Sequence, residues 1–573
     1  MANTPKQQAT AKRRNEPFRA WPMSLPGRMF ALYASWAIGL GMLIASAADW
    51  VNGWAIALLF LALGVLGIYD LRQTNQSIRR NYPILGNMRF FLEFIRPEIR
   101  QYFFESNTDA EPFSRNQRSL VYQRAKSVID KRAFGTQTDL YHAGSEWLNH
   151  STIPKNVTDA NFRVLVGGAQ CKQPYLASIF NISAMSFGAL SANAILALNK
   201  GAKLGNFAHD TGEGSVSQYH KVHEGDLIWE IGSGYFGCRR TEDGGFDAEK
   251  FRIQASLPQI KMIEIKLSQG AKPGHGGVLP GSKVTAEIAQ ARGVPQGVDC
   301  VSPAAHSAFS TPVELMQFIA QLRELSGGKP VGFKLCIGHA WEWFSMAKAM
   351  METGIKPDFI AIDGSEGGTG AAPVEFADHM GYPLLDGLLL VHNTLNGLGI
   401  REEIRLIASG KIISAFDIAK TCAMGADMCN SARGFMFALG CVMAQACHTG
   451  ACPSGVATQD RSRQQALVPE NKAERVFNFH HNTLKALGEL LGAAGLDHPI
   501  QVKPYHVSRR MGDQSVALLS EIYRFAKPGE LLEGKRPGPL FERYWDAAKA
   551  DCFRSGHSVW LGVLEAGATS NAL

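Results

Sequence analysis

Three cysteines lie close together in the segment "GCVMAQACHTGACPSGVATQD". Five residues separate Cys441 from Cys447, four separate Cys447 from Cys452, and Pro453 follows directly. Thiolates are soft ligands that suit iron or zinc. A structural zinc usually takes four ligands with shorter Cys-x-x-Cys pairs, so His448 would have to complete such a site at an unfavourable spacing. Because a cysteine followed by proline occurs at iron–sulfur sites, the spacing favours three thiolates that hold a cluster of three irons.

Parallel strands followed by helices are predicted to position these cysteines. Short apolar runs that end in glycine-rich turns precede helical patterns in at least six places, for example "IKMIEIKLSQ", "VGFKLCIG", "DFIAIDGSEGGTG" and "IRLIASGKI". Such runs are typical of strands in βα units. Their number and the length of the segment favour a (β/α)8 TIM barrel over an open doubly wound sheet. No GxGxxG motif opens the first unit, which disfavours a dinucleotide-binding sheet. The predicted fold class is therefore α/β.

The late strands of this barrel end in small residues. In a barrel the functional groups gather at the carboxyl ends of the strands, and a phosphate often binds after the seventh and eighth strands. The turns "SGK" (409–411) and "NSARG" (430–434) offer backbone N–H groups that an anion can approach, each beside a basic side chain. Together with "DGSEGGTGA" (363–371) on the preceding strand, they predict a phosphate cradle.

The N-terminal part contains two long apolar runs. Between Arg28 and Asp70 the only charged residue is Asp49, which divides two runs that are each long enough to cross a hydrocarbon core. We predict a basic cytoplasmic tail over 1–28 and a transmembrane helical hairpin over 29–70. Because basic residues dominate both flanks, both are expected in the cytoplasm. The sequence thus predicts a multi-pass protein of the cell inner membrane, in contact with membrane lipid, with two spans and a cytoplasmic catalytic domain.

Charge is distributed unevenly along the chain. The first 100 residues hold twelve basic and five acidic residues, a balance of +7 that equals the net charge of the whole chain. The rest is neutral, so no nucleic-acid partner is expected. We assign the remaining regions by composition and pattern: a connecting helical layer over 71–165, the barrel over 166–460 with the cysteine segment at 441–452, and a helical C-terminal extension over 461–573.

Several long motifs resemble the glutamate synthase family. The segment "CVMAQACHTGACPSGVATQD" is similar to that family's cluster-binding segment, and "ISAMSFGALSANAILALNKGAKLGNFAHDTGEGS" to its first barrel strand and helix. "EIKLSQGAKPGHGGVLPGSKV" resembles its substrate loop, while "IDGSEGGTGAAP" and "HNTLNGLGIREEIRLIASGKI" resemble its flavin-phosphate region. The resemblance covers residues 178–460. It implies FMN in the barrel and a [3Fe-4S] cluster on Cys441, Cys447 and Cys452.

The resemblance also implies which residues bind the cofactor. The "SAMS" loop would lie against the flavin ring, and Lys334 of "GFKL" would lie near the ring's N1 and C2 carbonyl, where a cation stabilises the reduced ring. A lysine within an apolar strand is costly to bury, which favours a functional role. The expected FMN-binding residues are Ser183, Ala184, Met185, Ser186, Lys334, Gly367, Gly368, Gly410, Lys411, Ala432 and Arg433.

A second set of residues is expected to bind substrate. Gln269 and Lys272 of "QGAKPG", together with Arg292, match positions that bind 2-oxoglutarate in the family, and Glu213 of "GEGS" is a further catalytic candidate. A dicarboxylate suits this set because arginine binds a carboxylate through two parallel hydrogen bonds and lysine adds a point charge. The family's substrate loop commonly carries an acidic residue where this chain has His275, so a different polar partner or a different 2-oxo acid stays open.

The implied function is a membrane-anchored, glutamate synthase-like oxidoreductase that acts on CH–NH2 groups. It would reductively aminate 2-oxoglutarate, or a similar 2-oxo acid, with ammonia or an amine as nitrogen donor. Electrons from ferredoxin or a membrane redox partner would pass through the cluster. Since the apolar hairpin follows the short tail directly, we expect no glutaminase domain. Two alternatives stay open: an FMN amino-acid or amine dehydrogenase that reduces a membrane quinone, and a non-catalytic membrane scaffold.

Overall fold

The computed structural model describes residues 27–108 and 111–557. Most of the predicted basic tail, residues 1–26, therefore lies outside the described residues. The chain forms two compact units, Met1–Ser106 and Asn107–Leu573. Their boundary falls within the predicted connecting layer, residues 71–165, so that the two parts of this layer belong to different units.

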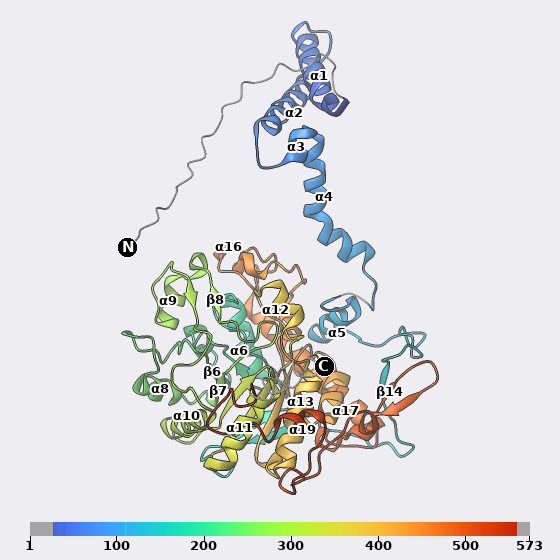
Figure 1. The fold of residues 1–573 in the computed structure, drawn as a ribbon. Coiled ribbons are helices and arrows are strands. Elements are labelled where there is room, and N and C mark those ends of the chain that lie inside the picture. Colours follow the sequence, from blue (N-terminus) through green and yellow to red (C-terminus); the bar gives the residue numbers. More distant parts are fainter. Residues whose placement is uncertain (1–26, 109–110, 558–573) are drawn as a thin grey trace, which may run out of the picture. The chain divides into compact units, whose positions relative to one another are not determined.

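The first unit contains a helical hairpin (Figure 1). A short 3-10 turn, η1 (Gly27–Met29), leads into α1 (Phe30–Ala47), which packs against α2 (Trp54–Arg72). Both helices are long and apolar enough to cross a membrane by length and composition. Small residues allow the close packing, because a Cβ atom on Gly39 would lie 3.0 Å from Leu61, and one on Gly64 would lie 2.8 Å from the Trp36 ring.

Two further helices, α3 (Ser77–Asn81) and α4 (Leu85–Ile99), follow the hairpin, and α4 continues into a π-helical turn, η2 (Arg100–Phe104). The buried Asp70 at the end of α2 fixes the start of α4. Its Oδ2 atom accepts hydrogen bonds from the Ile84 backbone N–H at 3.0 Å and from Asn87 Nδ2 at 2.5 Å. One oxygen of this buried carboxylate is thereby supplied with donors.

The second unit is built on a closed barrel of eight parallel strands, which confirms the predicted (β/α)8 fold. In order around the barrel the strands are β4 (Phe180–Ile182), β5 (His209–Asp210), β6 (Leu227–Ile231), β7 (Ile260–Lys266), β10 (Val331–Leu335), β11 (Phe359–Asp363), β12 (Arg405–Ser409) and β13 (Met428–Ser431). Strand β13 pairs with β4 and closes the ring.

Helices that follow the strands cover the outside of the barrel (Figure 1). They are α6 (Ala192–Gly205), α7 (Gln218–Lys221), α8 (Ala248–Ala255), α9 (Ala286–Arg292), α10 (Pro312–Leu325), α11 (Ala340–Thr353), α12 (Val374–His379), α13 (Leu384–Gly397), α14 (Ala415–Ala423) and α15 (Arg433–Leu439). Side-chain caps fix several of their starts. The Ser191 side chain accepts a hydrogen bond from the third residue of α6, and Thr311 forms a capping box with Glu314 at the start of α10.

The inside of the barrel is arranged in layers. One layer is a small apolar core that includes Ala208, Ile228, Met262, Ala361 and Met428 from the barrel strands. Side chains two residues further along a strand point to the same face. The next layer therefore carries polar groups toward the carboxyl ends of the strands: Asp210, Glu230, Glu264, Lys334, Asp363, Ser409 and Asn430. The core thus ends directly below a polar layer, where a barrel places its active site.

A hairpin of β2 (Arg163–Val166) and β3 (Tyr175–Ser178) packs on the apolar layer through Val166 and Ala177. The run "YLASIFNISAMSFG" forms two strands: β3 pairs with β2 outside the barrel, and β4 enters the barrel. A small antiparallel pair, β8 (Val278–Leu279) and β9 (Cys300–Val301), lies in the long connection after β7.

The segment after the barrel is helical only in part. It contains α16 (Arg461–Gln465), α17 (Pro469–Ala493), α18 (Leu519–Ile522) and α19 (Pro539–Tyr544), but also β14 (Val507–Arg510) and β15 (Val516–Leu518). These strands form a sheet with β1 (Glu146–Leu148). Helix α17 packs against α6 and against α5 (Arg115–Ala125). Its contact with α6 requires a glycine, because a Cβ on Gly201 would lie 2.5 Å from Val476.

Candidate active site

A cavity of about 450 Å³ lies at the carboxyl ends of the barrel strands. All the residues predicted to bind FMN line it, and so do all four predicted catalytic residues and Cys447. They come from loops after six of the eight strands and from a strand interior. Folding thus brings together residues that are up to 264 positions apart, from Ser183 to Cys447. Their individual roles stay predictions.

One end of the cavity is built from the turns after β11, β12 and β13. Gly367 and Gly368 follow β11, Gly410 and Lys411 follow β12, and Arg433 begins α15. A Cβ atom on Gly368 would lie 2.6 Å from Arg433 Nε, so this loop approaches the arginine side chain closely. Lys411 has a φ of +52°, a left-handed conformation that turns the chain sharply. This end combines close backbone approach with two cations, which suits a phosphate.

The loop after β4, Ser183 to Ser186, forms one wall of the cavity. The Ser183 hydroxyl lies 3.2 Å from the Ser409 hydroxyl, at the end of β12. Opposite the loop, Gly212 has a φ of +62°, and a Cβ on it would lie 2.7 Å from the Ser186 backbone N. The wall is therefore held by backbone packing and leaves its inner surface to a ligand.

At the other end of the cavity lies a buried arginine. Arg292, the last residue of α9, is 4% exposed and donates a hydrogen bond from Nη2 to the Phe187 carbonyl at 3.1 Å. Its guanidinium carbon lies 5.1 Å from the centre of the Phe236 ring. Within the described part of the chain its Nε atom has no hydrogen-bond partner. A buried cation with an unused donor suits an anionic ligand.

Two charged residues pair beside this arginine. Lys266 Nζ lies 3.1 Å from Glu213 Oε1. Burial disfavours the Glu213 carboxylate, but the neighbouring Lys266 and Arg292 outweigh burial and lower its pKa to about 2. Burial lowers the pKa of Lys272, and the positive charge of Lys266 lowers it further. This end of the cavity thus holds an ionised carboxylate among three basic side chains.

Several lining residues were not predicted from the sequence. Among the charged ones are Lys266, Lys283, Glu230 and Asp363. Altogether the lining contains seven lysine and arginine side chains against three carboxylates, so the cavity has a positive excess that favours anions. Glu230 lies within an apolar strand and Lys266 lies at the end of one. A charged residue in an apolar strand is the signal that singled out Lys334, and the same signal could have identified these two residues.

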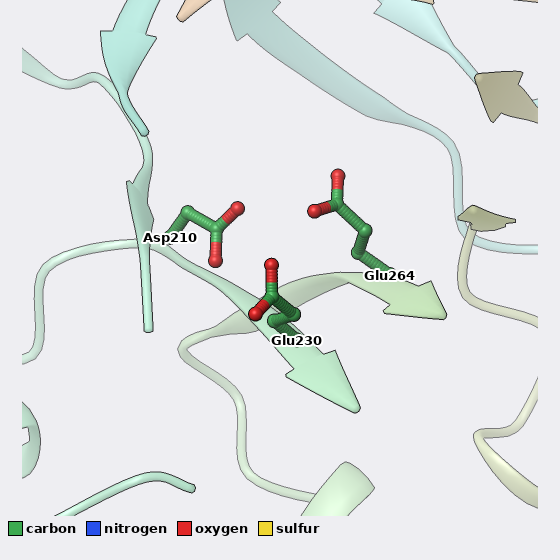
Figure 2. A group of neighbouring side chains, drawn as sticks. All are labelled: Asp210, Glu230 and Glu264. Atoms are coloured by element: carbon green, nitrogen blue, oxygen red, sulfur yellow. The ribbon is translucent and has the colours of Figure 1, made fainter. Parts of the chain in front are cut away.

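The polar layer below the cavity contains a further cluster. Asp210, Glu230 and Glu264 come from the neighbouring strands β5, β6 and β7, and Figure 2 shows their carboxylates pointing toward one another. Their ligand atoms all lie within 4.8 Å of one another. Lys334 from β10 forms ion pairs with Glu230 and, at 3.4 Å, with Glu264. Lys334 therefore joins this cluster to the cavity.

The three clustered cysteines line a smaller pocket next to the cavity. All are free thiols; Cys441 and Cys452 are buried, and Cys447 is half-buried. The Tyr122 hydroxyl donates to the Cys441 carbonyl at 2.6 Å, which ties α5 to the segment. Among the described residues, the one group of three ligand-type side chains found within 4.8 Å of one another is the carboxylate cluster, which does not include these thiols.

His275, the position that departs from the family pattern, does not line the main cavity. It is exposed, its Nδ1 lies 2.7 Å from the Gly276 carbonyl, and its ring packs edge-on against Phe376 at 5.4 Å. The same loop places Gln269 and Lys272 in the cavity. The departure therefore leaves the cavity lining unchanged.

Comparison with known proteins places the chain in a family. Residues 137–497 match the family described as "Conserved region in glutamate synthase". A Bacillus subtilis glutamate synthase large subunit-like protein, YerD, is 37% identical over 511 residues, with 80% of this chain and 97% of that protein covered. An archaeal glutamate synthase [NADPH] of Methanocaldococcus jannaschii is 38% identical over 317 residues, which cover 55% of this chain and 59% of that enzyme.

A ferredoxin-dependent glutamate synthase from Oryza sativa is 37% identical over 291 residues, which cover 49% of this chain and 17% of that enzyme. The match therefore spans a minor part of the plant protein and a little over half of the archaeal one. The barrel, the lined cavity and the extent of the family match lead to one assignment. The chain belongs to the glutamate synthase family, whose enzymes are oxidoreductases acting on CH–NH2 groups.

Proposed function

We propose that this chain is a membrane-anchored, FMN-dependent enzyme that reductively aminates 2-oxoglutarate, or a similar 2-oxo acid, with a [3Fe-4S] cluster as electron relay. The observation that carries the proposal is the single cavity that combines a phosphate cradle, Lys334 and an arginine–lysine end, with Cys447 in its wall. The names of the relatives, glutamate synthases that use NADPH or ferredoxin, support the reaction class.

The residues present fit FMN. A Cβ atom would lie close to the Ser186 backbone at Gly212 and to the Arg433 side chain at Gly368, so the loops that line the cavity pack tightly against one another. Lys411 and Arg433 supply charge for the phosphate, and Lys334 supplies a cation near the strand ends. When bound, FMN supplies hydride transfer and accepts single electrons.

The thiols fit an iron–sulfur cluster, since three free cysteines face one pocket. Burial disfavours the Cys452 thiolate, but hydrogen bonds from the Ala457 backbone and from Ser454 outweigh burial and lower its pKa. A lowered pKa favours the thiolate, the form that binds metal. Cys447 lines both the thiol pocket and the main cavity, which supports electron exchange between the two sites.

The substrate end would hold a 2-oxo dicarboxylic acid. Arg292 offers a buried guanidinium and Lys272 a buried ammonium, both in the cavity lining, and each suits one carboxylate. Glu213, paired with Lys266, remains ionised and can orient an ammonium group of the nitrogen donor or product. The nitrogen donor in this proposal is ammonia or an amine, and the electron donor is ferredoxin, NADPH or a membrane redox partner.

The membrane anchor is part of the proposal. Helices α1 and α2 expose large apolar side chains such as Ile44, Leu58 and Val65, and the hairpin ends carry the exposed aromatic residues Trp50, Trp54 and Tyr69. Apolar side chains on the outside and aromatic residues at the ends suit a bilayer. The basic flanks favour a cytoplasmic barrel at the inner membrane.

The test is an absorption spectrum of anaerobically purified protein with iron, sulfide and flavin counted, followed by turnover of the reduced enzyme. Bound FMN, about three irons per chain and amino-acid formation from 2-oxoglutarate and ammonia are the expected results. Flavin reduction by an amino acid or amine with electron transfer to quinone, and no reductive amination, would favour the dehydrogenase alternative. Protein without flavin and iron would refute the proposal.

A further inference from the structure

The carboxylate cluster below the cavity holds more negative charge than its surroundings neutralise. Asp210, Glu230 and Glu264 are each at most 2% exposed. One cation, Lys334, contacts two of them. Three buried carboxylates beside one ammonium would leave two uncompensated charges, and Asp363, whose carboxylate also interacts with Lys334 and Glu230, adds a further negative charge, so that some of these groups bind protons instead. Because Lys334 already supplies the cation, the cluster is a proton site and not a metal site.

Glu264 is the member that needs a permanent proton. Neither of its carboxylate oxygens accepts a hydrogen bond within the described residues, and the side chain has no exposed surface. Burial, and then the charge of Asp210, raise the pKa of Glu264 well above its ordinary value. As a neutral acid Glu264 donates its O–H to a neighbouring carboxylate, which satisfies both groups.

Asp210 is the member poised to exchange a proton. Burial and the charge of Glu230 raise its pKa to about 7, while Lys334 and the Gly212 backbone N–H, which is 3.0 Å from Oδ1, limit the rise. The acid and the carboxylate are therefore both populated near neutral pH. A modest change in nearby charge will then change the proton occupancy of this residue.

The cluster reaches the cavity through Glu230 and through Lys334, the ion-pair partner of the carboxylates. Glu230 and Lys334 line the cavity, whereas Asp210 and Glu264 do not. Negative charge placed next to Lys334 competes with the carboxylates for that cation. In a buried region this raises the affinity of Asp210 for a proton, because charges interact strongly at low dielectric.

We propose that Asp210 is a redox-linked proton site, which binds one proton when a cofactor in the cavity gains negative charge and releases it when that charge leaves, while Glu264 keeps its proton. The inference rests on the proposed occupancy of the cavity by FMN. Two electrons and one proton reduce the flavin and leave one net negative charge on it. One further proton passes from solvent to the Asp210 carboxylate, so two electrons enter with two protons. Reoxidation removes the two electrons and releases the two protons.

The test is the pH dependence of the flavin midpoint potential in the holoenzyme, with dithionite as reductant. Between about pH 7 and the higher pKa that Asp210 has in the reduced protein, the wild type should take up two protons per two electrons; below about pH 7, where Asp210 is already protonated in the oxidised protein, it should take up one proton. Each proton contributes about 30 mV per pH unit for a two-electron couple. The slope should therefore change by this amount near pH 7. Asp210→Asn should take up one proton throughout.

Glu264→Gln is the matched control, because its amide N–H replaces the O–H donor of the neutral acid and it should keep the change of slope. A wild type without this change, an Asp210→Asn protein that keeps it, or a Glu264→Gln protein that loses it would overturn the proposal.

Infrared difference spectra of the wild type provide a measurement that needs no variant. The C=O band of a protonated carboxyl should grow on reduction, and its absence would refute the proposal. The same band should titrate near pH 7 in the oxidised protein. This titration tests Asp210 separately from the cofactor, so a protein without flavin would refute the proposed function and still report on the proton site.

Discussion

Lys266 and Glu213 form a buried ion pair of 3.1 Å between the end of β7 and the loop after β5. The two side chains are 10% and 15% exposed, so solvent screens the pair weakly. Neighbouring positive charges hold the Glu213 pKa at about 2. Glu213 therefore stays ionised at every pH at which the enzyme is expected to work, and Lys266 supplies its counter-charge.

Removal of one partner should destabilise the protein more than removal of both. Glu213→Gln leaves Lys266 buried without its partner, and breaking such a pair costs about 3–5 kcal/mol. The double variant Glu213→Gln/Lys266→Met removes the stranded charge and should recover part of this loss. Unfolding midpoints in urea measure the order of stability among the wild type and the variants. A double variant less stable than either single variant would contradict the role of the pair.

The same pair predicts an acid limit for stability. The folded-state pKa of Glu213 lies below its ordinary value of 4.5, so its contribution to stability is complete above pH 4.5 and is lost as the pH falls toward 2. The wild type and Glu213→Gln should therefore differ most in unfolding midpoint above pH 4.5 and converge at lower pH. A difference in unfolding midpoint that grows on acidification would contradict the lowered pKa of Glu213 in the folded protein.

Arg292→Lys should weaken binding of 2-oxoglutarate and spare the flavin. Lysine keeps the charge but cannot form two parallel hydrogen bonds with a carboxylate. A lost charge-assisted hydrogen bond costs about 1.5–3 kcal/mol, which is roughly 10-fold to 100-fold in the dissociation constant. Ligand-induced changes in flavin absorbance measure this. Arg405→Lys is a matched control, because Arg405 lies at the start of β12, away from the cavity, and donates to the Leu165 carbonyl. Equal effects of both variants would remove Arg292 from the substrate site.

The barrel was largely predictable because its strands are short apolar runs that end in glycine turns. Two strands were missed for physical reasons. Strand β5 has two residues, His209 and Asp210, and both are polar, so no apolar run marks it. Strand β6, "LIWEI", carries a buried glutamate, which breaks the apolar pattern. The residues that spoil the pattern in these two strands, Asp210 and Glu230, are members of the carboxylate cluster, because the local pattern and the placement of the cluster conflict there.

The cavity lining was predicted from a family resemblance, whereas pairings between distant segments were not. The sheet that joins Glu146–Leu148 to Val507–Arg510 pairs residues about 360 positions apart, and no local signal specifies such a register. The Lys266–Glu213 pair was missed for the same reason. It depends on the loop after β5 reaching the end of β7, two strands further along the barrel, which only the closed fold determines.

Binding of 2-oxoglutarate should also weaken as the pH rises, because burial lowers the pKa of Lys272 below the ordinary lysine value of 10.5. Protonated Lys272 attracts a carboxylate and the neutral amine does not, so affinity is complete below the lowered pKa and falls as the pH rises through it. The dissociation constant, measured against pH in the oxidised enzyme, should show this rise at alkaline pH, the alkaline limb of the profile.

The variant Lys272→Gln should bind 2-oxoglutarate more weakly and lose the alkaline limb. Lys283→Gln, which removes a lysine that donates to the Cys447 carbonyl at 2.9 Å, should keep it. An alkaline limb that survives in Lys272→Gln would assign the titration to another cation and remove Lys272 from carboxylate binding.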